Sequence, residues 1–278
     1  MLRSTKTREP VANRLLAALP GKEYQRLRPH LEEGALAFGE VLYESGEIIR
    51  RVYFPNHGIV SLLSMVEERS TLEVGVVGAE GMVGISVFLG AQASLNQALV
   101  QGAGAAMSMK ADAMRKHVGH EGPLPDLLRL YANSLLAQIS QTAACNRFHA
   151  VEARLARWLL MTHDRIRSNE FRLTQEFLSH MLGVRREGVT NAARVLQQKK
   201  LISYVRGQIT IHDRAGLEAG SCGCYEIVKL NAFAKADIMD GQAHLLLNGK
   251  QHSALRRTIQ LRNHNPRQLH RFAKALCL

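Results

Sequence analysis

The stretch at residues 172–212 constrains the fold of this chain more than any other. Thr174 is a suitable N-cap, and Gly183 permits a tight turn between a short helix and a second helix expected over residues 185–198. A hairpin follows, in which LISYV and QITIH flank a turn that begins at Arg206. The order helix, glycine turn, helix and hairpin predicts a winged helix-turn-helix.

The two faces of the second predicted helix differ in chemistry. Its inward face would carry Val189, Ala192, Ala193 and Leu196. Polar side chains at the start of such a helix can reach base edges in a major groove. The predicted base contacts are Arg186, Glu187, Thr190 and Asn191. The predicted phosphate contacts are Thr174, Gln175, Arg185, Arg194, Lys199 and Arg206. The alternative is an amphipathic helical pair with a solvated basic face.

The positive charge of the chain is unevenly distributed. The formal net charge is +12, yet residues 1–150 carry only +1 and residues 151–214 carry +6. Residues 215–228 carry −2 and residues 229–278 carry +7. Little periodicity is visible in this last segment, and we expect a disordered basic extension there. The concentration of charge around the predicted helix-turn-helix favours double-stranded DNA as a partner.

The first half of the chain has a different pattern. Two helical segments are expected at residues 11–19 and 22–33. Short β-rich pieces then alternate with glycine from about residue 34 to residue 110, which is typical of an antiparallel sandwich or barrel. The residues expected to face inward are Val41, Tyr43, Val52, Phe54, Ile59 and Leu62. A later amphipathic helix, at residues 150–166, contains Trp158, which we expect in the core.

A long helix is predicted from about residue 124, with Pro123 and Pro125 in its first turn. One apolar stripe follows its helical spacing and consists of Leu124, Leu128, Tyr131, Leu135, Ile139 and Thr142. The spacing alone allows the stripe to pack on the β-rich part of the same chain or against a second copy.

Residues 173–197, LTQEFLSHMLGVRREGVTNAARVLQ, resemble the helix-turn-helix of the Crp/Fnr transcriptional regulators. FGEVLYESGE (38–47), YFPNHGIVSLL (53–63) and GAEGMVGISVFLG (78–90) follow the order of that family's cyclic-nucleotide-binding-like β-roll. The resemblance implies an α+β fold with an N-terminal antiparallel β-roll of jelly-roll type, a long dimerisation helix and a C-terminal winged helix-turn-helix. It also favours packing of the stripe between two chains.

The expected divisions of the chain follow from this resemblance. They are a sensor domain at 12–122, the dimerisation helix at 123–146, the DNA-binding domain at 147–228 and the basic extension at 229–278.

The chain departs from the family at the ligand pocket. Cyclic-nucleotide binders carry a glutamate after the glycine that Gly84 matches, and this chain has Ile85. They also carry an Arg-Ser pair where this chain has Asn96 and Gln97 in an uncharged stretch. Loss of these charge-assisted bonds predicts a degenerate pocket that does not hold cyclic AMP in the usual manner. Family members that sense oxygen through an iron–sulfur cluster carry a group of cysteines near the N-terminus. Because no cysteine precedes Cys145 here, such a cluster is not expected. We therefore expect no cofactor.

The other chemically reactive residues form no recognised motif in the sequence. Cys145, Cys222 and Cys224 are expected to be inert thiols, and no metal site is predicted. His117 and His120 are expected in an exposed loop, and Glu32 and Glu33 at a helix end. Sequence signatures of phosphate-cradling loops, serine hydrolases and zinc proteases are absent from the chain. We therefore predict no catalytic residues and no enzyme activity.

The sequence thus predicts a cytoplasmic, homodimeric transcription regulator that reads an inverted-repeat operator, with Arg186 and Glu187 matching the family's base contacts. RNA polymerase and a small-molecule effector of unknown identity are further candidate partners, and no membrane is expected as a partner. Two alternatives remain: an ungated DNA-binding protein with a vestigial sensor domain, and a β-roll that serves as a protein-interaction module.

Overall fold

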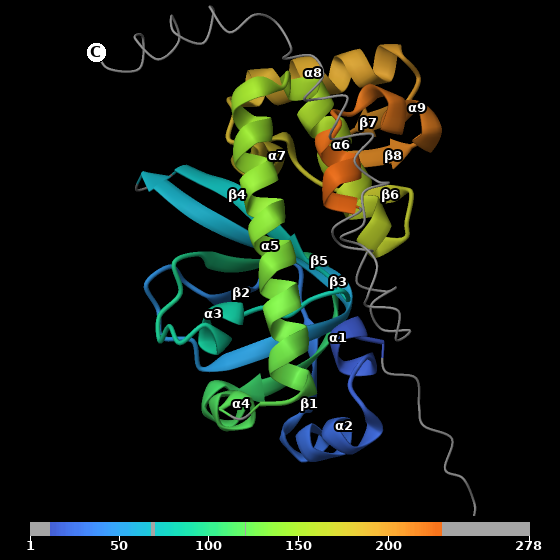
Figure 1. The fold of residues 1–278 in the computed structure, drawn as a ribbon. Helices are drawn as coiled ribbons and strands as arrows, with labels where there is room; N and C mark the ends of the chain where they lie inside the picture. Colours follow the sequence, from blue (N-terminus) through green and yellow to red (C-terminus); the bar gives the residue numbers. More distant parts are fainter. Residues whose placement is uncertain (1–11, 68–69, 120, 230–278) are drawn as a thin grey trace, which may run out of the picture. The chain divides into compact units, whose positions relative to one another are not determined.

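The computed structural model describes residues 12–67, 70–119 and 121–229, and Figure 1 shows a β-rich part, a long helix and a small winged part in chain order. The first part contains α1 (Arg14–Ala17), α2 (Gly21–Leu27), the 3-10 helix η1 (Arg28–His30), β1 (Glu32–Leu36), β2 (Val41–Tyr43), β3 (Arg51–Glu67), β4 (Ser70–Val77), α3 (Ile85–Phe88), β5 (Gln97–Lys110) and α4 (Ala111–Val118). The remainder contains α5 (Pro123–Phe148), α6 (Val151–Ile166), β6 (Glu170–Arg172), α7 (Gln175–Leu182), α8 (Arg186–Gln198), β7 (Ile202–Val205), β8 (Gln208–Ile211) and α9 (Arg214–Gly220).

Strands β1 to β5 form one antiparallel sheet, which we call the β-roll. Its strand order is β1-β5-β3-β4, and β2 also pairs with β5. The pairing of β3 with β5 shifts register between Pro55 and Val60, and such bulges bend a sheet. The predicted antiparallel β-roll is confirmed.

The core of the β-roll contains most of the residues predicted to face inward. Tyr43, Val52, Phe54 and Leu62 are buried in this core, and Ile59 is buried in the cluster that contains Trp158. Val41 is 39% exposed, so its predicted inward position is wrong. The register of β2 against β5 shifts between Val41 and Tyr43, which breaks the alternation that would place both on one face.

The second predicted helix is shorter than expected. It ends at Leu27, and Pro29 lies in η1, because a proline cannot donate the backbone hydrogen bond that would continue a helix. Glu32 and Glu33 are exposed residues of β1, not of a helix end.

The long helix α5 begins with the prolines of its first turn and buries the predicted stripe within its own chain. Leu124, Leu128, Tyr131 and Leu135 belong to the core cluster of the β-roll, and Ile139 packs against it. The Tyr131 hydroxyl donates to the carbonyl of Met82 at 3.1 Å. The expectation that this stripe packs between two chains is therefore wrong.

One close approach shows why α5 can lie against the β-roll. A Cβ atom at Gly81 would lie 2.5 Å from the Tyr131 ring, so only glycine leaves room for that ring. Gln138 then joins α5 to β4, since its amide pairs with both the N–H (2.6 Å) and the carbonyl (3.3 Å) of Val76.

Helices α6 to α9 and strands β6, β7 and β8 form the winged domain. Its three-stranded sheet has the order β6-β8-β7, and β6 was not predicted from the sequence. Trp158 is buried, as predicted, in a core that also contains Leu178, Leu196 and Ile209. Among the described residues, no helix is both long enough and apolar enough to cross a bilayer.

Candidate nucleic-acid interface

The turn between α7 and α8 has the geometry that the sequence predicted. Thr174 caps α7, and its hydroxyl oxygen accepts a hydrogen bond from the Phe177 N–H at 3.0 Å. Gly183 ends α7 with φ +59, a left-handed conformation that glycine adopts at little cost. A Cβ atom there would lie 2.6 Å from Leu72 of β4, so Gly183 also permits close packing of the turn against the β-roll.

The inward face predicted for the second helix of the pair is confirmed, and the first helix buries most of its apolar residues as well. Leu178, Met181 and Leu182 of α7 are buried, and so are the four inward residues predicted on α8. Phe177 is only half-buried, and its ring lies 6.1 Å from the ring of Phe38 in the β-roll. The first helix of the pair therefore contacts the β-roll.

The opposite face of α8 presents most of the predicted base contacts. Arg186, Glu187 and Asn191 are exposed, the first two in the first turn of the helix. Thr190 is half-buried, and its hydroxyl lies 3.0 Å from the Arg186 carbonyl and 3.1 Å from Gln175 Oε1. Thr190 and Gln175 thus also connect α8 to α7.

The predicted phosphate contacts surround this face. Arg185, Arg194 and Lys199 are exposed along α8, and Arg206 is exposed at the tip of the β7–β8 wing. The two turn residues, Arg206 (φ 50) and Gly207 (φ 81), both have positive φ, as a tight two-residue hairpin turn requires. The structure thus presents cations from both α8 and the wing.

These cations differ from two other arginines of the winged domain, Arg165 and Arg214, which form ion pairs with acids. Arg214 pairs with Asp164 and Glu218, and Arg165 pairs with Glu80. Among the residues that the structure describes, Arg185, Arg186, Arg194, Lys199 and Arg206 form no ion pair with an acid. Five unpaired cations on one helix and its wing are suited to bind a polyanion.

The residues assigned to the degenerate pocket contact other groups of the protein. Ile85 follows Gly84 at the start of α3 and belongs to the core cluster of the β-roll. Gln97 donates a hydrogen bond to Glu44 Oε2 at 2.7 Å, and Asn96 is half-buried. An isoleucine in this place offers no acceptor for a ribose hydroxyl.

A buried polar network between the β-roll and α6 was not predicted. The Trp158 indole N–H donates to Glu73 Oε1 at 3.0 Å, and Ser61 lies 2.7 Å from Glu73 Oε2 and 2.6 Å from Gln101 Oε1. Gln101 then donates to Thr162 of α6 at 3.1 Å. Burial raises the pKa of Glu73 to about 7, although Ser61, Arg157 and Trp158 act in the opposite direction.

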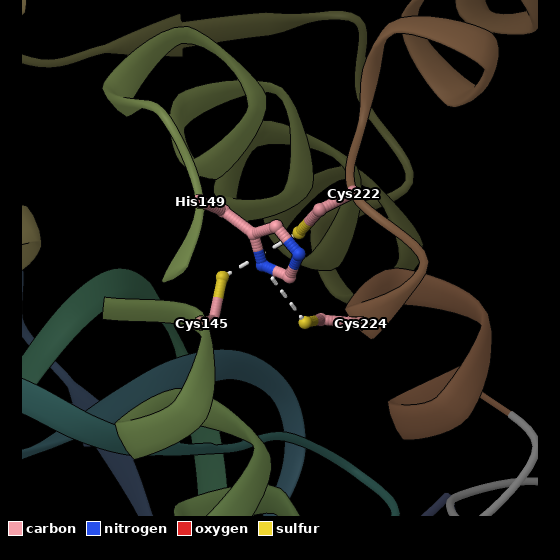
Figure 2. A group of neighbouring side chains, drawn as sticks. All are labelled: Cys145, His149, Cys222 and Cys224. Carbon is pink, nitrogen blue, oxygen red and sulfur yellow. Dashed lines mark hydrogen bonds between the residues drawn. The ribbon is translucent and has the colours of Figure 1, made fainter. Parts of the chain in front are cut away.

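Three cysteines that are far apart in the sequence meet in the structure. Cys145, Cys222 and Cys224 are buried together with His149 at their edge (Figure 2), a grouping that was not predicted from the sequence. The sequence features that could have pointed to this cluster are two short spacings, from Cys145 to His149 and from Cys222 to Cys224. His117 packs edge-on against His30 at 5.0 Å, and His120 lies outside the described residues.

Residues 153–219 match the sequence model of the Crp-like helix-turn-helix domain. A search among curated proteins gave no match. Among solved structures, a Crp/Fnr-family regulator from Eubacterium rectale has a TM-score of 0.62 at 16% identity, covering 75% of this chain and 98% of that one. FixK2 from Bradyrhizobium japonicum has a TM-score of 0.59 at 16% identity, with coverages of 69% and 98%.

A third similar structure is a CRP/FNR-family transcriptional regulator from Thermus thermophilus. Its TM-score is 0.58 at 21% identity, and the match covers 68% of this chain and 98% of that one. In each case nearly the whole of the solved chain is matched. The order of β-roll, long helix and winged domain is therefore the fold that this chain shares with them.

Proposed function

We propose that this chain binds a twofold-symmetric DNA operator through α8. It has the fold of the Crp/Fnr transcription regulators and contains their helix-turn-helix domain. The observation that carries the proposal is the set of unpaired cations on α8 and the wing, beside two polar residues in the first turn of α8. A recognition helix reads bases with this end in the major groove.

Base reading is assigned to the exposed polar residues of α8. Arg186 can donate two hydrogen bonds to the O6 and N7 atoms of guanine, and Glu187 can accept from the N4 amino group of cytosine. Asn191 is one turn further along the same exposed face and suits adenine. Thr190 is assigned a contact through its methyl group, since its hydroxyl is already bonded within the protein.

Phosphate binding is assigned to the residues around this face. Arg185, Arg194, Lys199 and Arg206 would each neutralise a phosphate charge, and their spread from α8 to the wing would fix the orientation of the helix in the groove. Thr174 and Gln175 lie at the N-terminal end of α7, where backbone N–H groups favour an anion.

Dimerisation is assigned to the outer face of α5, because the apolar stripe is buried in the chain itself. Leu136 is 62% exposed and Leu130 is 39% exposed on this helix. Asn133, Leu136, Ser140 and Ala143 follow each other at spacings of three and four and are all exposed. Such a seam of small and apolar residues allows two helices to approach closely.

Regulation by cyclic AMP is not part of the proposal. The β-roll has a buried isoleucine in place of a ribose acceptor, so it serves as a scaffold or responds to a different signal. RNA polymerase is the further partner that a promoter-bound regulator would contact.

The proposal is tested by selecting fragments of the source genome with the purified full-length protein at near-physiological salt. We expect an enriched twofold-symmetric motif whose half-sites are about 10 bp apart between centres. The control is Arg26→Ala, which removes one exposed charge on α2 and should enrich the same motif. Fragments enriched without any common motif would contradict sequence-specific binding.

A further inference from the structure

Four potential metal ligands converge where the long helix meets the winged domain (Figure 2). Cys145 is in the last turn of α5, and His149 follows the end of that helix. Cys222 and Cys224 come from the segment after α9. One ligand atom from each residue lies within 4.8 Å of the others, although Cys145 and Cys222 are 77 positions apart in the sequence.

The separations suit a single small ion. The Sγ atoms of Cys145 and Cys222 are 3.4 Å apart, and Cys224 Sγ lies 3.4 Å from His149 Nδ1. A tetrahedral ion with metal–sulfur bonds of about 2.3 Å would hold its sulfur ligands about 3.8 Å apart. A 4Fe–4S cluster binds each of its cysteines to a different iron and would hold the sulfurs farther apart.

Two buried arginines lie beside the cysteine cluster and also point to a bound ion. Arg154 and Arg157 of α6 are each 7% exposed, and the Nε atom of each has no hydrogen-bond partner among the described residues. Arg154 donates to the Leu182 carbonyl and forms no ion pair with an acid among the described residues. Arg157 lies 3.5 Å from the Thr142 hydroxyl, and the acid that it acts on electrostatically, Glu73, forms no salt bridge with it. Buried cations without a counter-charge are costly.

The thiols can supply this counter-charge. Both arginines interact electrostatically with Cys145, and Arg154 also with Cys222. Three thiolates and a neutral histidine around a divalent ion carry a net charge of −1. Zinc accepts this donor set in a tetrahedral arrangement.

We propose that Cys145, His149, Cys222 and Cys224 bind one zinc ion, which fixes the end of α5 to the segment that closes the winged domain. With four protein ligands the ion has no open position, so its role is structural. Gln141 donates a hydrogen bond to Cys224 Sγ at 3.0 Å and would orient that ligand. Because His149 lies in the connection between α5 and α6, the ion would hold the winged domain relative to the long helix.

The chain offers a matched control for this site. Its fourth cysteine, Cys277, lies outside the described residues and is not a proposed ligand. Elemental analysis of the full-length protein, purified under reducing conditions with zinc in the medium, should give one zinc per chain. Cys277→Ser should retain that zinc, whereas Cys222→Ser and Cys224→Ser should each lose most of it.

A second measurement needs no substitution, since a cysteine variant can fail to fold. Wild-type protein is stripped with a chelator and titrated with cobalt(II), which should bind at one equivalent. Three thiolates should then give a sulfur-to-cobalt charge-transfer band in the near ultraviolet and strong tetrahedral d–d bands. Removal of zinc should lower the thermal midpoint by about 5 °C or more, and returning zinc should restore it.

Several outcomes would overturn the proposal. The first is a zinc content well below one per chain after reloading. The second is bound iron in place of zinc, and the third is a Cys145–Cys222 disulfide in the reduced preparation. Equal loss of metal in Cys277→Ser would also count against it. Operator binding is measured separately, so failure of the zinc site leaves the DNA-binding proposal standing.

Discussion

Trp158 of α6 donates its indole N–H to Glu73 of β4 at 3.0 Å, and both side chains are buried. The bond joins the winged domain to the β-roll through a carboxyl group. Ser61 has one hydroxyl proton but two acceptor neighbours, Glu73 Oε2 and Gln101 Oε1. A protonated Glu73 can donate to Ser61, which then donates to Gln101, so all four polar groups are satisfied. The hydrogen bonding of Ser61 and Gln101 at this contact therefore depends on the protonation of Glu73.

The stability of the protein should depend on pH through Glu73. Its pKa rises from an ordinary value of 4.5 to about 7 on folding, so between these values the folded state binds more protons than the unfolded state. The stabilisation is complete below pH 4.5 and is lost as the pH rises through 7, by about 3 kcal/mol at most. Glu73→Gln keeps the hydrogen bond from Trp158 and should remove this part of the pH dependence in denaturant titrations.

A matched variant is Trp158→Phe, which removes the indole donor from Glu73 and leaves an aromatic ring. The donor favours the ionised carboxylate, so its loss should move the midpoint of the pH dependence to a higher pH. Identical pH profiles for wild-type protein and Glu73→Gln would show that Glu73 is not the titrating group.

The dimer assignment predicts that Leu136→Glu gives monomers. A charge at the centre of the outer seam of α5 would repel the same charge on the second chain, while the folded monomer is unaffected because Leu136 is 62% exposed. Sedimentation velocity of the full-length protein measures this change. Leu95→Glu, at a position 86% exposed in the β-roll, is the control and should remain dimeric. A dimer that persists in Leu136→Glu would place the interface elsewhere.

Cyclic AMP should not stabilise the protein. Loss of the ribose acceptor and of the phosphate-binding arginine should each weaken binding by about 1.5–3 kcal/mol, because both are hydrogen bonds that involve a charged group. We expect an unchanged thermal midpoint and no heat of binding at micromolar nucleotide. Saturable binding in this range would contradict the assignment of Ile85 and Asn96 to a degenerate pocket.

Deletion of residues 231–278, which lie outside the described residues, should reduce only nonspecific affinity. The segment is rich in basic residues, so its loss should lessen the slope of log affinity against log salt. Operator choice, measured by competition between operator and random DNA, should stay the same. Unfolding on deletion would instead show that this segment belongs to the folded protein.

Local signals made the winged domain predictable. Thr174 and Gly183 are the residues that cap the two ends of α7. The polar and apolar faces of α8 follow helical spacing. The spacing in α5 likewise identified a buried face. It could not show that Tyr131 packs on Met82 of the same chain, because periodicity describes one helix and not its neighbour.

Long-range relationships were the part that the sequence could not supply. Cys145 meets Cys222, and Glu73 meets Trp158, only after the β-roll, α5 and α6 have packed. Neither pair has a characteristic spacing along the chain. Val41 was misplaced for a similar reason, since its orientation depends on a register shift against a strand more than fifty residues away.

Whether α8 reads bases is decided by the binding of Arg186→Ala to the selected operator. We measure the affinity of both proteins, by fluorescence anisotropy at fixed salt, for the operator and for versions with each base pair changed. Arg186→Ala should lose about 1–3 kcal/mol on the operator and become indifferent to the base at one position in each half-site. An equal loss on every sequence would make Arg186 a phosphate contact, and no loss would contradict the assignment of α8 as the recognition helix.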